Sequence, residues 1–154
     1  NKYYGGLLSA QTKQIKKLEQ QVEDLTPEDL TFIKVDIHPF TVNCMYNIDD
    51  NGKQHRSESY NKWIAKFPAH QIPTLVEYET YDNIDFTKPI GIEIEYICMN
   101  GFDIDNLNKA TIDMIFNRVL RIDDNIVKEV KATQIGRCNT YSQGKIFFAI
   151  YNIK

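Results

Sequence analysis

The sequence is poor in the residues that build disulfide frameworks and zinc sites. Its 154 residues include only three cysteines and three histidines, all far apart. An odd number of unpaired cysteines argues against a disulfide scaffold, and no two histidines have the spacing that shares a metal on one helix face. No apolar run is long enough to cross a bilayer, and the first residues lack a secretory signal pattern. We therefore expect a reduced, cytoplasmic protein without a membrane partner.

Positive charge is also scarce. The chain has 18 Lys and Arg against 21 Asp and Glu, a formal net charge of -3. Lys and Arg supply most of the non-specific affinity for nucleic acid, so such a partner would require an uneven distribution of charge. Otherwise the composition, 42% hydrophobic and 25% charged, is that of a soluble globular protein. The length suits one compact domain.

An amphipathic segment precedes this domain. Ile15, Leu18, Val22 and Leu25 follow one another at helical spacing among Lys, Gln and Glu residues. The pattern predicts a helical extension over residues 1–30 and a main domain over 31–154. The stripe within residues 8–25 would form a packing or dimer seam, or would dock a protein partner.

Hydrophobic periodicity predicts an α+β fold for the main domain. A period of two residues predicts strands over residues 31–38, 90–99, 126–134 and 145–153, with a weaker signal over 75–78. A helical period predicts helices over residues 57–67 and 106–120, and Asn51-Gly52 predicts a hairpin tip. The expected architecture is a mixed sheet with packed helices, in the order strand, helix, strand, helix, strand, strand.

Carboxylates gather around the second predicted helix. Asp103 and Asp105 precede it, and Asp123-Asp124 follow it. If the flanking strands are neighbours, we expect Asp124 to approach Asp103 and Asp105. Such a cluster is costly unless a cation offsets the repulsion, and an all-oxygen shell suits Mg²⁺, or Mn²⁺ in its place. Lys109, one turn after Asp105, could steady charged oxygens of a phosphodiester during hydrolysis.

Simpler interpretations exist for these acids. Asp at a strand-to-helix junction is often a helix cap, and Asp123 either supports the metal site or only shapes a turn. Asp113 has the spacing for an ordinary ion pair with Lys109. A calcium loop does not fit, because Asn108 stands where glycine is needed and Met114 where the bidentate acid is needed.

The order of these residues resembles the motif of the RusA Holliday-junction resolvases. The matching residues are Asp103-x-Asp105-Asn106-Leu107-x-Lys109, then Asp113, then Asp123-Asp124, and the similarity extends over about residues 35–151. The resemblance implies a homodimer, bacterial or phage-encoded, that makes paired symmetrical nicks across four-way DNA junctions in recombination and repair. It assigns metal ligation to Asp103, Asp105 and Asp124, and an essential catalytic role to Lys109. The family often has basic residues where this chain has Asn100, Gly101 and Phe102.

Two other functions remain open. One is a branched-DNA binding or regulatory protein with weak or no cleavage, tethered to a partner by the N-terminal helix. The other is a hydrolase of small phosphate esters, which needs a deep closed pocket. Candidate phosphate contacts, which could equally form a solvated surface, are Lys53, Arg56, Lys128, Lys131 and Arg137. We expect core positions at Tyr60, Trp63 and Phe67.

Overall fold

A computed structural model describes residues 30–154, apart from the side chains of residues 77–79, and Thr31–Lys154 form one compact unit. The expected helical extension, with its stripe over 8–25, lies outside the described residues. Among the residues that are described, no helix combines the length and the apolar character needed to cross a membrane.

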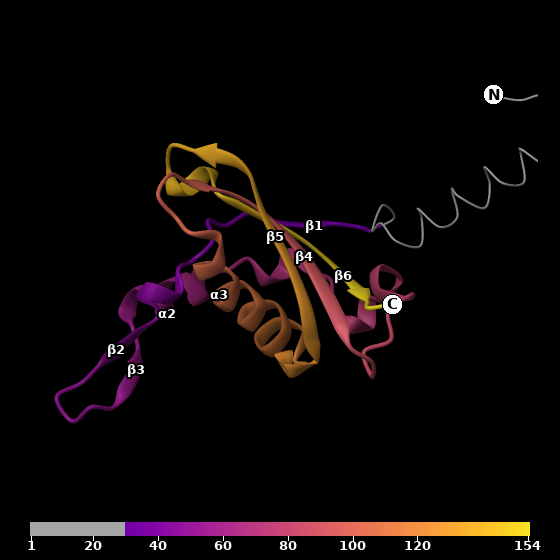
Figure 1. Cartoon of the computed structure of the whole chain (residues 1–154), viewed down its shortest axis with the longest axis horizontal. Helices are drawn as coiled ribbons and strands as arrows, with labels where there is room; N and C mark the ends of the chain where they lie inside the picture. The colour runs from indigo at the N-terminus through magenta and orange to yellow at the C-terminus, as the bar shows by residue number, and fades with distance from the viewer. Residues whose placement is uncertain (1–29) are drawn as a thin grey trace, which may run out of the picture. The chain divides into compact units, whose positions relative to one another are not determined.

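Six strands and two α-helices make up the unit (Figure 1). The strands are β1 (Ile33–Val35), β2 (Tyr46–Ile48), β3 (Gln54–Arg56), β4 (Ile90–Met99), β5 (Val127–Cys138) and β6 (Lys145–Asn152). The helices are α2 (Glu58–Lys66) and α3 (Asn108–Ile112), and α3 continues directly into a π-helical segment, η5 (Asp113–Leu120). Short 3₁₀ turns fill the connections, at Val42–Cys44, Ala69–Gln71, Leu75–Tyr81, Ile104–Asn106, Asp124–Ile126 and Tyr141–Gln143.

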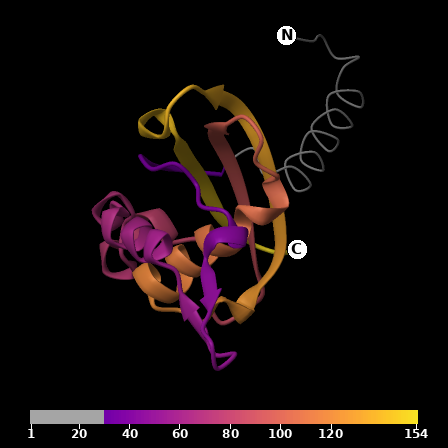
Figure 2. The same cartoon turned by 90° about the vertical axis from the view of Figure 1, so that its left-hand side faces the viewer.

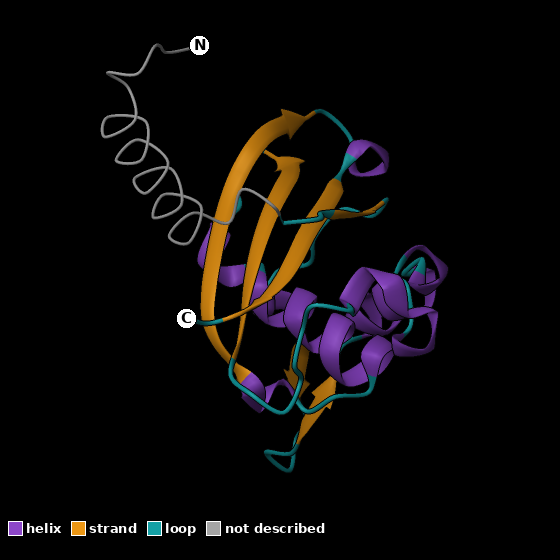
Figure 3. Ribbon diagram, turned by 90° about the vertical axis from the view of Figure 1, so that its right-hand side faces the viewer, coloured by secondary structure: helices purple, strands orange, loops and turns teal. Residues whose placement is uncertain are grey.

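Four strands form a mixed sheet in the order β1-β6-β4-β5. β4 and β5 are parallel, whereas β6 is antiparallel to both β4 and β1. The helices gather on one face of this sheet (Figure 3). The predicted α+β class with a mixed sheet is confirmed. β5 is an edge strand, because only β4 pairs with it among the described strands.

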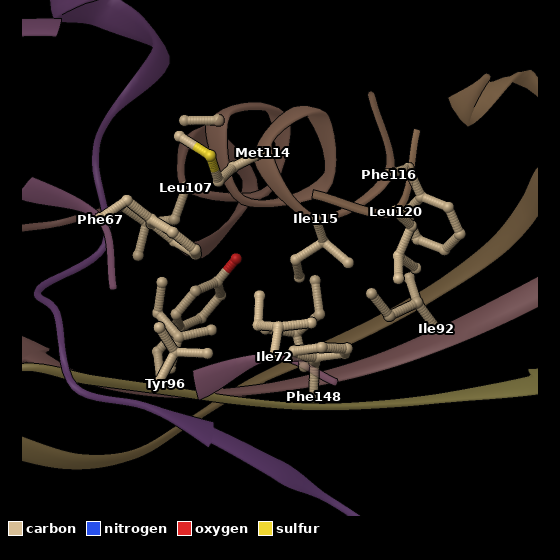
Figure 4. Close-up of a cluster of buried hydrophobic side chains, with 14 of the residues drawn as sticks. Phe67, Ile72, Ile92, Tyr96, Leu107, Met114, Ile115, Phe116, Leu120 and Phe148 are labelled. Carbon is tan, nitrogen blue, oxygen red and sulfur yellow. The ribbon is translucent and has the colours of Figure 1, made fainter. Parts of the chain in front are cut away.

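The core lies between the sheet and the helix that joins β4 to β5. Alternate residues of β4, Ile92, Ile94 and Tyr96, have no exposed surface, as the two-residue period of a strand requires. Ile115 and Phe116 of η5 face them and are also fully buried (Figure 4). The apolar stripe of the helix therefore packs on the sheet as its spacing predicts.

The predicted helix over 57–67 is confirmed as α2. The hydroxyl of Ser57 caps it by accepting the Tyr60 N–H at 3.0 Å, and Pro68 follows its end. Tyr60, Trp63 and Phe67 are buried as expected.

The strand predictions over residues 75–78 and 31–38 differ from the structure. The weak strand signal over 75–78 is wrong, because Leu75–Tyr81 is a 3₁₀ helix. Buried Tyr81 donates its hydroxyl to the Pro73 carbonyl at 2.8 Å, so a side-chain contact eight residues back along the chain closes this segment. The first strand is shorter than expected, because the Ile37 N–H turns back to the Val35 carbonyl at 3.0 Å.

Candidate active site

Asp103, Asp105 and Lys109 occupy the corner that follows β4. Asp103 precedes the 3₁₀ turn Ile104–Asn106, Asp105 lies within that turn, and Lys109 lies in the first turn of α3. All three side chains are exposed, and none has a hydrogen-bond or ion-pair partner within the described residues. The corner therefore presents two carboxylates and one ammonium group to solvent.

The two carboxylates do not cap a helix. Asp103 makes no side-chain capping hydrogen bond to the turn that it precedes, and Leu107, not an acid, stands at the start of α3. The simple capping interpretation of Asp105 is therefore wrong. The chain keeps these acids at the corner without using them for local structure.

Buried contacts below the corner hold it in place. Leu107 is fully buried, and the Tyr96 hydroxyl donates to Asn108 Oδ1 at 2.8 Å. The same hydroxyl lies 3.1 Å from Thr111 Oγ1, which donates to the Leu107 carbonyl at 3.0 Å. Figure 4 shows the Tyr96 hydroxyl directed from the sheet toward the helix. Because burial raises the pKa of Tyr96 far above its usual value, this hydroxyl stays a proton donor.

Asp123 and Asp124 lie at the other end of the helix. The Asp123 carboxylate accepts the Asn125 N–H at 3.0 Å and so shapes the turn before β5. The Asp124 N–H donates to Asn117 Oδ1 at 3.0 Å, while its half-buried carboxylate has no partner among the described residues. Asp123 therefore has a structural role, and the Asp124 carboxylate remains available.

The predicted convergence of the acids within one chain is wrong. In the parallel pair, Ile90 lies opposite Val127 at one end and Met99 opposite Cys138 at the other. Asp103 follows the Met99 end, whereas Asp124 precedes the Val127 end. The helix between them, α3 with η5, is on the order of 20 Å long at about 1.5 Å per residue. Accordingly, no three Asp, Glu, His or Cys side chains of the described residues form a group that could hold a metal ion.

The expected ion pair between Lys109 and Asp113 is also absent. The Asp113 carboxylate instead accepts from Asn117 Nδ2 at 2.7 Å and from the Tyr60 hydroxyl at 3.3 Å, and Arg118 lies 3.8 Å away. Burial and the nearby Asp113 charge raise the pKa of Tyr60 to about 12. Asp113 thus joins the helix to α2, and Lys109 has no acidic partner in the part of the chain that the structure describes.

The candidate phosphate contacts lie on two separate surfaces. Lys53 and Arg56 belong to the β2–β3 hairpin, which projects from the body of the unit (Figure 2). The hairpin turn is built on Asp49, which accepts the Asn51 and Lys53 N–H groups at 2.9 Å. Lys128, Lys131 and Arg137 lie along β5. All five side chains are exposed and none pairs with an acid within the described residues, so their charges are available to a polyanion.

A pocket beside Asp103 was not predicted from the sequence. It has a volume of about 770 Å³, and its walls include His38, Phe40, Trp63, Phe102 and Tyr141. Trp63 was expected only as a core residue, and the others come from segments that are far apart in the chain. No local pattern could identify this group, because the tertiary fold alone brings it together.

A scan against protein-family models gives no match to this chain, and a search of curated proteins gives none either.

Proposed function

We propose that this protein is a Mg²⁺-dependent endonuclease of the RusA type that acts as a homodimer on branched DNA, in the cytoplasm of a bacterium or phage-infected cell. The observation that carries the proposal is the corner after β4. Asp103, Asp105 and Lys109 are exposed there, and within residues 30–154 they make no capping bond and no ion pair. Residues with no structural task at the spacing of a nuclease motif are candidates for chemistry.

A second chain is needed to complete the set of acids. Within one protomer, Asp124 lies a helix length away from Asp103 and Asp105. A two-fold axis beside the free edge of β5 would set two β5 strands antiparallel, so that the start of one lies beside the end of the other. The partner's Asp124 would then lie at the same end as Asp103 and Asp105. We propose that each site combines these three carboxylates across the dimer.

The edge of β5 suits such pairing. The strand extends over Val127–Cys138, and its outer edge has no neighbour among the described strands. Val130 and Ile135 on this strand are 42% and 48% exposed. A long edge strand with exposed apolar side chains is a template for another strand.

Each part of the composite site would have a definite task. Three carboxylates form the oxygen ligand set that Mg²⁺ or Mn²⁺ prefers. When bound, the metal would supply an activated water and would neutralise charge on the phosphate. Lys109 would bind a non-bridging phosphate oxygen with its free ammonium group. The five unpaired basic side chains on the hairpin and on β5 would bind the flanking DNA backbone.

Exchange of subunits between two inactive variants tests this arrangement. Asp105→Asn and Asp124→Asn are each expected to abolish Mg²⁺-dependent nicking of a labelled four-way junction. A mixed dimer contains one site in which both acids are intact and one in which both are replaced. Mixing the two variants should therefore restore nicking, at about a quarter of the wild-type number of sites if subunits exchange freely. Asp82→Asn, an exposed acid outside the motif, serves as the matched control and stays active.

Other results would change the conclusion. If each variant is inactive and mixing restores nothing, the acids do not combine across a dimer. A branched-DNA binding protein without cleavage is the second candidate, because the described residues of one protomer form no complete acid cluster. Tight binding of the junction by the wild-type chain without nicks, with and without EDTA, would favour that candidate. Neither binding nor nicking on any branched DNA would reject both.

A further inference from the structure

We propose that the pocket beside Asp103 binds an unpaired nucleobase at the branch point of the DNA. The inference rests on the proposed function and specifies how that site recognises its substrate. The pocket has a volume of about 770 Å³, within the range of about 300–1,000 Å³ that is usual for small-molecule sites.

Aromatic rings on separate segments form the walls of the pocket. Phe102 and Tyr141 both contact the ring of His38, with centroid distances of 5.1 Å and 4.7 Å. The ring of Phe40 lies beside that of Trp63 in α2, with a centroid distance of 5.7 Å. Tyr141 is 63% exposed, so much of its ring is free to stack on a ligand. Single-stranded nucleic acids bind to exposed aromatic faces of this kind.

The ring of His38 is a fixed part of this wall and does not transfer protons. Its Nδ1–H donates to the Pro39 carbonyl at 2.7 Å, and its Nε2 accepts the Met99 N–H at 2.9 Å. Burial lowers the pKa of His38, so the ring is neutral at physiological pH. Both ring nitrogens are occupied, which leaves the pocket to recognise its ligand by stacking and shape.

The charge around the pocket is complementary to a nucleotide. Lys62 and Lys66 of α2 line it, and Lys66 has no acidic partner among the described residues. Lys62 lies 3.2 Å from Glu58, in an exposed pair that a phosphate could replace. The one acid in the lining, Asp36, is held by Lys145 at 3.1 Å and by Lys34 at 3.7 Å. A base between the rings would thus have its phosphate near two lysines.

One wall residue of the pocket, Phe102, adjoins the proposed active site in the chain. Phe102 directly precedes Asp103, so a base held against Phe102 would fix the adjoining phosphodiester close to the acids. In the open form of a four-way junction, the bases at the crossover are stacked on one side only. Extruding one of them therefore costs less than extruding a base from a continuous duplex. The pocket would select branched over linear DNA for this reason.

Trp63 is the single tryptophan of the chain, so its fluorescence reports on the pocket. The test uses the full chain carrying Asp105→Asn, in EDTA, with a four-way junction that contains 2-aminopurine at the crossover. We expect the junction to quench Trp63 and to change 2-aminopurine emission, whereas a linear duplex does neither. Tyr141→Ser should weaken junction binding by at least roughly fivefold and abolish the 2-aminopurine signal. Tyr141→Phe, which restores the ring, should rescue both.

The lysines are tested by the salt dependence of binding. Replacing Lys62 and Lys66 together by Ala should reduce the slope of log affinity against log salt by about 1–2. Lys88→Ala is the matched control, because Lys88 is 70% exposed and also pairs with an acid on its own segment. This control should leave the slope unchanged.

Three results would overturn the proposal. One is a Tyr141→Ser variant that binds the junction with unchanged affinity and unchanged 2-aminopurine emission. Another is an equal response to linear duplex. The third is Trp63 emission that depends on protein concentration without DNA, which would mean that a second copy covers the pocket.

The proposed function is judged separately, by nicking with Asp105 intact. Normal nicking by Tyr141→Ser would reject the pocket alone, and a 2-aminopurine response without any wild-type nicking would reject the nuclease alone.

Discussion

Tyr96→Phe removes a single oxygen atom from below the candidate active site. The buried ring keeps its packing, but Asn108 Oδ1 loses a donor at 2.8 Å, and Thr111 Oγ1 loses a neighbour at 3.1 Å. Asn108 is half-buried and water can replace the lost donor in part, whereas Thr111 is fully buried. A hydrogen bond of this kind contributes about 1–1.5 kcal/mol, so we expect a loss of that size. For a chain of this length, the melting temperature should fall by about 3–6 °C.

Urea unfolding followed by Trp63 fluorescence measures this loss. The matched control is Tyr46→Phe, because Tyr46 is 38% exposed and its hydroxyl has no hydrogen-bond partner within the described residues. Its midpoint should not change. Equal losses in the two variants, or none in Tyr96→Phe, would refute the role of the Tyr96 hydroxyl. A loss of several kcal/mol would instead indicate that the core repacks around the new side chain.

Two further perturbations test the segment around His38. Gly144→Ala should destabilise the fold by on the order of 1–3 kcal/mol, because a Cβ there would lie 2.5 Å from His38 Cα. The control is Gly136→Ala, whose Cβ would have its nearest contact at 3.6 Å and which should have little effect on the urea midpoint. The free energy of unfolding should also fall as the pH drops below about 6.5, by up to about 1.4 kcal/mol per pH unit, because the unfolded chain binds a proton on His38 before the folded chain does. Above that pH the ring is neutral in both states, so this dependence should end there, and His38→Gln should remove it.

Regular elements were predictable where one local pattern determined them. β4 has the predicted bounds because its alternation is unbroken from Ile90 to Met99, with one face against the helix. α2 begins at a capping serine and ends before a proline, and both signals are local. By contrast, Leu75–Tyr81 depends on a contact between Tyr81 and Pro73, and β5 extends four residues beyond its expected end because β4 continues alongside it.

For the helix between Asp105 and Asp124, the sequence predicted the end of the helix but not its hydrogen bonding. Its apolar stripe predicted a helix ending at Leu120, which is correct, but not the π-helical hydrogen bonding of Asp113–Leu120. The helix ends in a left-handed residue, Arg121, where glycine is usual. An α-helix has 3.6 residues per turn and a π-helix slightly more. Over two turns the two apolar patterns differ little, so the sequence could not distinguish the two kinds of helix.

The residues of the candidate site stay a prediction, whereas their predicted convergence within one chain is wrong. The sequence identified Asp103, Asp105, Lys109 and Asp124, and the structure leaves each of these side chains without a structural partner among the described residues. The prediction that they meet within one chain assumed that a returning helix brings its two ends together. A parallel crossover does the opposite, because the helix must carry the chain back along the full strand before the next strand begins. In β4 and β5 that distance separates Asp105 from Asp124. Acids placed at opposite ends of a parallel pair can meet only when another chain reverses the direction, and an antiparallel contact between two edge strands is the simplest way to do so.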